Sequence, residues 1–172
     1  MNPAVLIRLA DAEDAAHLPE IERSSGEAFR ALPDLAWIAD DAVMSAEQHA
    51  ELIAAGGVWV AATETRLVGF ISAATETDGL HVWQMAVAHD AQGRGVGRAL
   101  LNAVIESARA RNVSEVTLTT FRDVAWNAPF YARSGFRILE ARCLNERLRG
   151  VLASEIANGL PGERRCAMQL RL

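Results

Sequence analysis

Three glycines alternate with other residues from position 93 to 97 and lead into an aliphatic segment, in the stretch QGRGVGRALL at residues 92 to 101. Glycine adopts backbone angles with positive φ and lets backbone amides approach a ligand closely. At the start of a helix such amides, with the positive end of the helix dipole, can bind a pyrophosphate. Arg94 and Arg98 could add charge-assisted contacts. The stretch is therefore either a phosphate-binding loop or a turn that only links a strand to a helix.

The glycine spacing excludes two familiar phosphate motifs. A dinucleotide fingerprint that begins at Gly93 needs a small residue where Arg98 stands, and one that begins at Gly95 needs a small residue where Leu100 stands. A nucleotide-binding P-loop needs a lysine, and the chain contains none. A dinucleotide-dependent oxidoreductase is therefore a weak interpretation, and triphosphate binding through a P-loop is excluded.

A second group of residues follows about 30 positions later, in the stretch WNAPFYARSGF, which contains Asn127, Tyr131, Gly135 and Phe136. Together the two stretches resemble the GCN5-related N-acetyltransferase (GNAT) family. Its acyl-coenzyme A loop is written Q/R-x-x-G-x-G/A, and Gln92, Gly95 and Gly97 occupy the named positions. The resemblance implies an α/β (α+β) fold with a mixed, mostly antiparallel sheet of about seven strands flanked by helices.

The resemblance also implies the reaction, which is transfer of an acetyl group from acetyl-coenzyme A to a primary amine of a small molecule or peptide. In the family, the pantetheine arm pairs with the strand before the glycine loop, and Asn127 would contact the cofactor arm or cap local backbone. The implied cofactor-binding residues are Met85, Ala86, Val87, Gln92, Gly93, Arg94, Gly95, Val96, Gly97, Arg98, Asn127 and Tyr131.

Tyr131 occupies the position at which the family places its general acid, and it is the only tyrosine in the chain. A phenol with an ordinary pKa of about 10 stays protonated at neutral pH and can protonate a leaving thiolate. We therefore predict that Tyr131 is catalytic.

The sequence departs from the family at the base that removes the amine proton, because Gln84 stands on the strand where many family members carry a glutamate. His81 has a suitable pKa range, and Glu27 and Glu22 lie on a helix that lines the acceptor groove in the family. His81 and Glu27 are the predicted candidates, and attack through a chain of waters is equally compatible. The segment 31 to 44, with Asp40 and Asp41, is expected to face the acceptor amine.

Hydrophobic periodicity predicts the elements that hold these residues. Strands are expected at 4–9, 58–64, 67–76, 80–88, 114–121, 136–143 and in the last ten residues. Helices are expected from about 11 to 32, at 46–55 behind a capping box at Ser45 and Gln48, at 96–111, at 124–135 and at 145–158. The strand, loop, helix and strand around residue 95 require a parallel strand pair, whereas consecutive strands in the middle indicate antiparallel pairing.

Length and composition limit the possible number of domains and the possible classes of partner. The chain has 172 residues, 51% hydrophobic and 23% charged, which predicts one globular domain over residues 4–172. A net charge of −5 argues against nucleic-acid binding. The sequence has no apolar stretch long enough for a membrane span and no secretory signal, so a cytoplasmic location is expected.

The two cysteines, Cys143 and Cys166, have no spacing typical of a metal site, and both are expected on late strands as buried thiols. No metal is therefore expected. A non-catalytic acyl-coenzyme A binding module stays open as an alternative function, and the edge strands and aromatic residues would serve a homodimer as well as a monomer.

Overall fold

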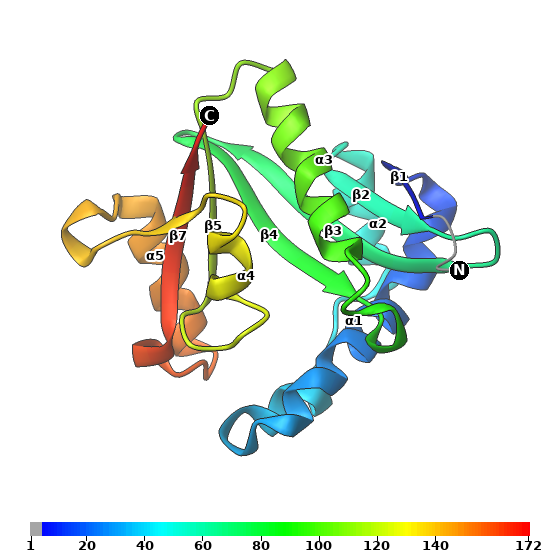
Figure 1. Cartoon of the computed structure of the whole chain (residues 1–172), viewed down its shortest axis with the longest axis horizontal. Helices are drawn as coiled ribbons and strands as arrows, with labels where there is room; N and C mark the ends of the chain where they lie inside the picture. The colour runs from blue at the N-terminus through cyan, green and yellow to red at the C-terminus, as the bar shows by residue number, and fades with distance from the viewer. Residues whose placement is uncertain (1–4) are drawn as a thin grey trace. The chain divides into compact units, whose positions relative to one another are not determined.

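A computed structural model describes residues 5–172 of the chain, and its strands follow one another in the order that the periodicity predicts (Figure 1). The strands of this part of the chain form a seven-stranded sheet in the order β1-β2-β3-β4-β5-β7-β6. Their bounds are β1 Leu6–Leu9, β2 Val58–Ala62, β3 Leu67–Glu76, β4 Gly79–Val87, β5 Glu115–Phe121, β6 Arg137–Ile138 and β7 Arg165–Arg171.

Strand directions confirm the predicted mixed sheet. β1 pairs antiparallel with β2 and β2 with β3, and β7 pairs antiparallel with both β5 and β6. β4 and β5 pair parallel, with His81 opposite Thr117. Parallel strands need a crossover connection, and α3 (Val96–Ala110) supplies it between them.

The chain divides into two compact units. The first comprises residues up to Ala73 together with Gln84–Ser107, and the second comprises Ala74–Trp83 together with Ala108–Leu172. β3, β4 and α3 each begin in one unit and end in the other. The expectation of a single domain over residues 4–172 stays a prediction, and its first residue lies outside the described part of the chain.

Helices cover both faces of the sheet in the first unit. Phe70 of β3 packs in a buried cluster with residues of α1 (Leu18–Gly26) and α2 (Ala46–Ala54), whereas the neighbouring Gly69 faces Val96 and Leu100 of α3. A Cβ on Gly69 would lie 3.2 Å from Leu100. Successive residues of a strand point to opposite faces, so this alternation sets the two helical layers. Figure 1 shows α3 running across this part of the sheet.

Local capping starts the early helical segments. Ser45 accepts a hydrogen bond from the amide of Gln48, and the Gln48 side chain accepts one from the Ser45 amide, which confirms the predicted capping box before α2. Asp11 and Asp14 form a second such box at η1 (Ala12–His17). The helix predicted over 11–32 is instead a succession of η1, α1 and the 3₁₀ segment η2 (Glu27–Ala31).

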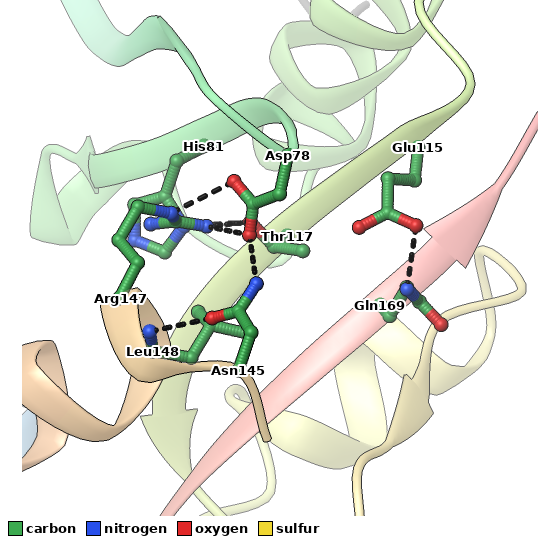
Figure 2. A network of polar contacts seen from close by, with 8 residues as sticks. All are labelled: Asp78, His81, Glu115, Thr117, Asn145, Arg147, Leu148 and Gln169. Atoms are coloured by element: carbon green, nitrogen blue, oxygen red, sulfur yellow. Dashed lines mark hydrogen bonds and ion pairs between the residues drawn. The ribbon is translucent and has the colours of Figure 1, made fainter. Parts of the chain in front are cut away.

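The second unit contains α4 (Ala128–Ala132) and α5 (Glu146–Ala157), and α5 packs against β7. Figure 2 shows the polar contacts at the start of α5. Arg147 forms an ion pair with Asp78, at 2.8 Å, and also donates to Thr117 of β5, at 3.0 Å. Asn145 caps α5 by accepting from the Leu148 amide and also bonds to Asp78. The β3–β4 turn, β5 and α5 are therefore fastened together by one polar cluster.

The structure differs from the predicted strand at 136–143 and adds detail to the segment 31–44. The strand expected at 136–143 is short, because only β6, Arg137–Ile138, pairs with β7, and Ala141–Cys143 turns into a 3₁₀ segment, η5. Cys143 is consequently exposed, and only Cys166 is a buried strand thiol. The segment 31–44 contains a 3₁₀ helix, η3 (Pro33–Asp40), which buries Leu35 and Ala39.

Candidate functional site

The glycine loop lies in the first unit, at the start of α3. Gly93 and Gly95 have φ angles of 73° and 85°, in the left-handed region that favours glycine. A Cβ placed on either residue would meet no atom within 4 Å. Glycine is therefore required here by backbone conformation, and the space beside both residues is open to a ligand.

The first backbone amides of α3 lie next to the glycine loop. Ala99 donates the first helical bond, to the carbonyl of Gly95 at 3.0 Å, so the amides of residues 96 to 98 lie at the open helix end. The helix that follows is 15 residues long, and its dipole makes this end electropositive. Arg94 and Arg98 are exposed on either side of Val96. This arrangement fits a diphosphate.

Gln92 braces the loop from within the protein. Its side-chain amide donates to the carbonyl of Val87 at 2.9 Å and to the carbonyl of Ser25 at 3.4 Å. The backbone of His89 is held in turn by the hydroxyl of Ser24, at 3.0 Å. Gln92 therefore joins the end of β4, the last turn of α1 and the glycine loop.

The strand before the loop has backbone groups that lie beyond its described pairing with β5. That ladder covers Leu80, His81 and Val82. Met85 and Val87 follow it with half-buried side chains, while Ala86 belongs to the core of the first unit. A strand edge of this kind can accept an extended ligand as an added strand.

Tyr131 lies on α4 in the second unit, with its ring in edge contacts with Phe130 and Phe136. The side chain is 9% exposed, and burial raises the pKa of its phenol to about 12. Asn127 precedes α4, and its side-chain oxygen accepts from the Phe121 amide at 3.4 Å. The Asn127 side chain therefore ties α4 to the end of β5.

His81 is 1% exposed on β4 in the second unit, and its Nδ1 lies 2.8 Å from the Thr117 hydroxyl. Burial, reinforced by the positive charge of Arg147, lowers the pKa of His81 to about 4. The imidazole is neutral at physiological pH, which a proton acceptor requires, but its basicity is weak.

The acidic residues of the first unit have different surroundings. Glu27 and Asp40 both bind Arg30, at 2.9 and 2.8 Å, on an exposed surface. Asp41 accepts from the amide of Ala42. Glu22 is more enclosed, with 17% of its side chain exposed, and lies 3.4 Å from a fully buried residue, His49.

The predicted residues therefore fall into two groups. Met85, Ala86, Val87, Glu27 and the glycine loop belong to the first unit, whereas Asn127, Tyr131 and His81 belong to the second. The sequence interpretation missed His49. Its position four residues before Ile53, behind a recognisable capping box, was a signal that it lies on the inner face of α2.

Two further features of residues 5–172 bear on the site. None of their helices is both long and apolar enough to cross a membrane. Within the same residues, no group of three or more histidine, cysteine, aspartate or glutamate side chains could hold a metal ion.

Comparison with known proteins gives two kinds of match. The Acetyltransferase (GNAT) family profile matches residues 18–136, which include the glycine loop and Tyr131. An uncharacterized N-acetyltransferase, ycf52, from Porphyra purpurea is 34% identical over 76 residues, which are 43% of this chain and 41% of that protein. The chain thus matches less than half the length of that relative.

Solved structures share the fold at low sequence identity. The PaiA N-acetyltransferase of Thermoplasma acidophilum, crystallised with coenzyme A, has a TM-score of 0.72 at 17% identity, over 98% of this chain and 99% of that one. A ribosomal-protein-alanine N-acetyltransferase of Brucella melitensis has a TM-score of 0.68 at 24% identity, over 97% and 99%.

Proposed function

Because this chain belongs to the Acetyltransferase (GNAT) family, we propose that it transfers the acetyl group of acetyl-coenzyme A directly to a primary amine of a small molecule or peptide. The observation that carries the proposal is the glycine loop, in which two residues with positive φ leave open space at the N-terminus of a 15-residue helix. In this proposal the diphosphate occupies the open space beside the two glycines.

Main-chain groups of the first unit hold the donor in this proposal. Amides from Gly93 to Arg98 donate to the diphosphate oxygens, and the guanidinium groups of Arg94 and Arg98 add charge at the rim. The backbone of Met85, Ala86 and Val87 pairs with the pantetheine arm, and an amide there polarises the thioester carbonyl. When bound, acetyl-coenzyme A supplies the activated acyl carbon.

Tyr131 protonates the departing thiolate. The raised pKa of its phenol, about 12, keeps the proton on the hydroxyl throughout the physiological range. Because a thiol has a pKa near 8.5, transfer of a proton from the phenol to the thiolate is uphill on its own, and the phenolate is reprotonated by the proton that the attacking nitrogen loses as the amide forms. At pH 7 the hydroxyl of Tyr131 is protonated and available as a donor. Asn127 supports this role by holding α4 on the end of β5.

The amine must lose a proton before or during attack. Glu27 and His81 stay candidate bases, Glu27 as an exposed carboxylate beside Arg30 and His81 as a neutral buried imidazole. Gln84, on the strand where the family often has a glutamate, cannot take this role. This substitution also favours a second candidate function, an acyl-coenzyme A binding module without catalytic activity.

One pair of measurements separates the two functions. Calorimetry with coenzyme A tests the glycine loop, and release of free thiol from acetyl-coenzyme A across a panel of amines and short peptides tests transfer. If the protein is an acetyltransferase, it should both bind coenzyme A and release thiol in the presence of an amine. Binding without release from any amine supports the non-catalytic module, and absence of binding contradicts both functions.

A further inference from the structure

The polar cluster at the start of α5 contains hydrogen-bond donors that no protein group uses. Arg147 donates to Asp78 through Nε and Nη2, at 2.8 and 2.9 Å, and its Nη2 also donates to the Thr117 hydroxyl, at 3.0 Å. These contacts use the hydrogen on Nε and both hydrogens on Nη2. Nη1 is buried and has no partner among residues 5–172. One nitrogen of a largely enclosed guanidinium is therefore left with its donors unused.

The imidazole of His81 adds a second unused donor. The residue is 1% exposed, and its Nδ1 lies 2.8 Å from the Thr117 hydroxyl. Arg147 can only donate to this hydroxyl, so the single hydroxyl hydrogen is available to Nδ1. The neutral ring then carries its own hydrogen on Nε2, which is also buried and has no partner in the described part of the chain. Both unpartnered groups are therefore donors, and the group that they lack is an acceptor.

The unused donors meet beside one side chain of β5. His81 and Arg147 both bond the hydroxyl of Thr117, and Figure 2 shows the imidazole and the guanidinium together next to it. All three residues belong to the second unit. Buried polar atoms in proteins nearly always have a hydrogen-bond partner, so two such atoms in one cluster indicate a binding site.

Neighbouring carboxylates of the second unit are already engaged. Glu115 of β5 accepts a hydrogen bond from Gln169 of β7 at 2.7 Å, as Figure 2 shows. Glu155 of α5 forms an ion pair with Arg165 at 2.9 Å. An anionic acceptor for the unused donors therefore has to come from a ligand.

Trp83 lies between this cluster and solvent. It shares a face of β4 with His81, because alternate residues of a strand point the same way. The two rings make an edge contact at 4.5 Å between centroids, and Trp83 is 49% exposed. The unused donors therefore lie one aromatic side chain below the surface, and this side chain can also pack against an apolar part of a ligand.

We propose that Arg147 and His81 bind a carboxylate of the acceptor, so that the substrate is an amine that also carries a carboxylate, such as an amino acid. Nη1 donates to one carboxylate oxygen and Nε2 to the other. Donors on two separate side chains match the two oxygens of a carboxylate, and charge-assisted bonds of this kind are roughly twice as strong as neutral ones.

The place of the site on β4 favours the acceptor as its ligand. This inference rests on the proposed acetyl transfer, in which Met85, Ala86 and Val87 of the same strand bind the pantetheine arm. His81 stands four residues before Met85. In this role His81 is a binding residue and not the base, because Nδ1 accepts from Thr117 and Nε2 donates to the ligand. Glu27 is then the candidate base of the two.

Matched acceptors test the inference. L-amino acids are compared with the corresponding L-amino acid amides, which keep the amine and the side chain but lack the carboxylate. We expect kcat/KM for the preferred amino acid to exceed that for its amide by roughly 10- to 100-fold, the usual effect of hydrogen bonds to a charged group. The N-acetylated amino acid should inhibit by competition with the amino acid. A carboxylate that changes the turnover of acids and amides alike, without competition, would show an effector site and overturn the assignment to the acceptor.

Variants of the two donors give a second readout, which is the ratio of kcat/KM for acid and amide. In His81→Asn the shorter amide can still bond Thr117 but does not reach the position of Nε2, so the ratio should fall toward one. His81→Gln places an N–H near that position and should keep most of the preference. Arg147→Lys keeps a positive charge beside Asp78 but lacks Nη1, and it should also lose the preference. Arg149→Lys, exposed two residues later on α5, is the control that should retain it.

The ratio separates this role from others. A base at His81 would lower the turnover of acids and amides equally and leave the ratio unchanged in His81→Asn. Equal kcat/KM for acids and amides in the native protein, or a preference that survives in both His81→Asn and Arg147→Lys, would overturn the inference and mean that the donors bind water only. Should these variants fail to fold, the comparison of acids with amides in the native protein decides the matter.

Calorimetry distinguishes failure of this site from failure of the proposed function. N-acetylated amino acids and their amides are titrated into the native protein in the presence of coenzyme A. Tighter binding of the acids supports the carboxylate site whether or not any amine is acetylated, and equal binding contradicts it. Absence of thiol release with every amine contradicts the proposed function instead.

Discussion

At the scale of single residues, the glycines at 93 and 95 are required by conformation and not by crowding. Their positive φ angles are costly for other residues, yet the space around them is open. Loss of the diphosphate site can therefore be separated from damage to the protein core.

Gly95→Ala should cost roughly 1–2 kcal/mol in unfolding free energy, because alanine is strained at this φ. The loss in binding free energy for coenzyme A, measured by calorimetry, should exceed this loss in unfolding free energy, since the methyl group enters the space proposed for the diphosphate. Gly150→Ala is a matched control inside α5, where an added Cβ meets no atom within 4 Å. The unfolding free energy of this control should rise by about 0.5–1 kcal/mol, and its affinity for coenzyme A should be that of the native protein. Unchanged binding in Gly95→Ala would contradict the loop assignment.

Tyr131→Phe isolates the phenol hydroxyl, because the ring contacts with Phe130 and Phe136 are kept. We expect kcat to fall by about 100-fold or more, the usual effect of removing a general acid, while the affinity for coenzyme A is retained. Since the pKa of Tyr131 is about 12, the native enzyme should show no loss of rate from this group below about pH 10. Equal turnover in the two proteins would remove Tyr131 from its proposed role.

At the scale of elements, α5 depends on a few polar anchors as well as on apolar packing. Arg147 and Asp78 are largely enclosed, with 17% and 18% of their side chains exposed, and Arg147 also reaches Thr117 of β5. Leu148 is the buried apolar residue of this helix. The ion pair therefore joins α5 to the β3–β4 turn that precedes His81.

Arg147→Met should destabilise the protein by about 3 kcal/mol, the usual cost of removing one partner of an enclosed ion pair. Arg142→Met is the matched control, because Arg142 pairs with Glu140 where the side chains are 81% and 68% exposed. An exposed pair of this kind contributes about 0–1 kcal/mol. Urea unfolding of both variants measures the difference, and equal stability would show that the ion pair does not fasten α5.

At the scale of the whole molecule, buried histidines should set the response of stability to acid. The pKa of His81 is about 4 in the folded protein, well below its ordinary value near 6.5. Between these values the unfolded chain binds more protons than the folded one, so stability falls as the pH falls. His49 acts in the same direction. Asp14, whose pKa is lowered chiefly by its hydrogen bonds from Arg8, extends the loss to lower pH. Burial raises the pKa of Asp78, but the hydrogen bonds from Arg147 and Asn145 outweigh it and lower the pKa, so Asp78 acts in the same direction.

His81 alone should lower the unfolding free energy by about 2 kcal/mol between pH 7 and pH 5. His81→Asn should reduce this pH dependence, whatever its stability at pH 7, because asparagine does not titrate. Urea unfolding at several pH values provides the measurement. An identical slope in the native protein and the variant would show that His81 is not the group responsible.

Much of this molecule follows from local sequence. The capping box of Ser45 and Gln48, the glycines before α3 and the parallel pairing of β4 with β5 were predictable, because each depends on a few neighbouring residues or on one crossover connection. The two motifs likewise indicate the family by residue type and spacing alone, and the family profile confirms it.

Other features required the tertiary structure, because they join residues that are distant in the chain. Pairing with β7 limits β6 to Arg137–Ile138, so a strand-like stretch ends early and Cys143 is exposed. The contacts of Glu22 with His49 and of Asp78 with Arg147 span 27 and 69 residues. Periodicity places a side chain on a face, whereas packing alone decides which polar group it meets there and whether water can reach it.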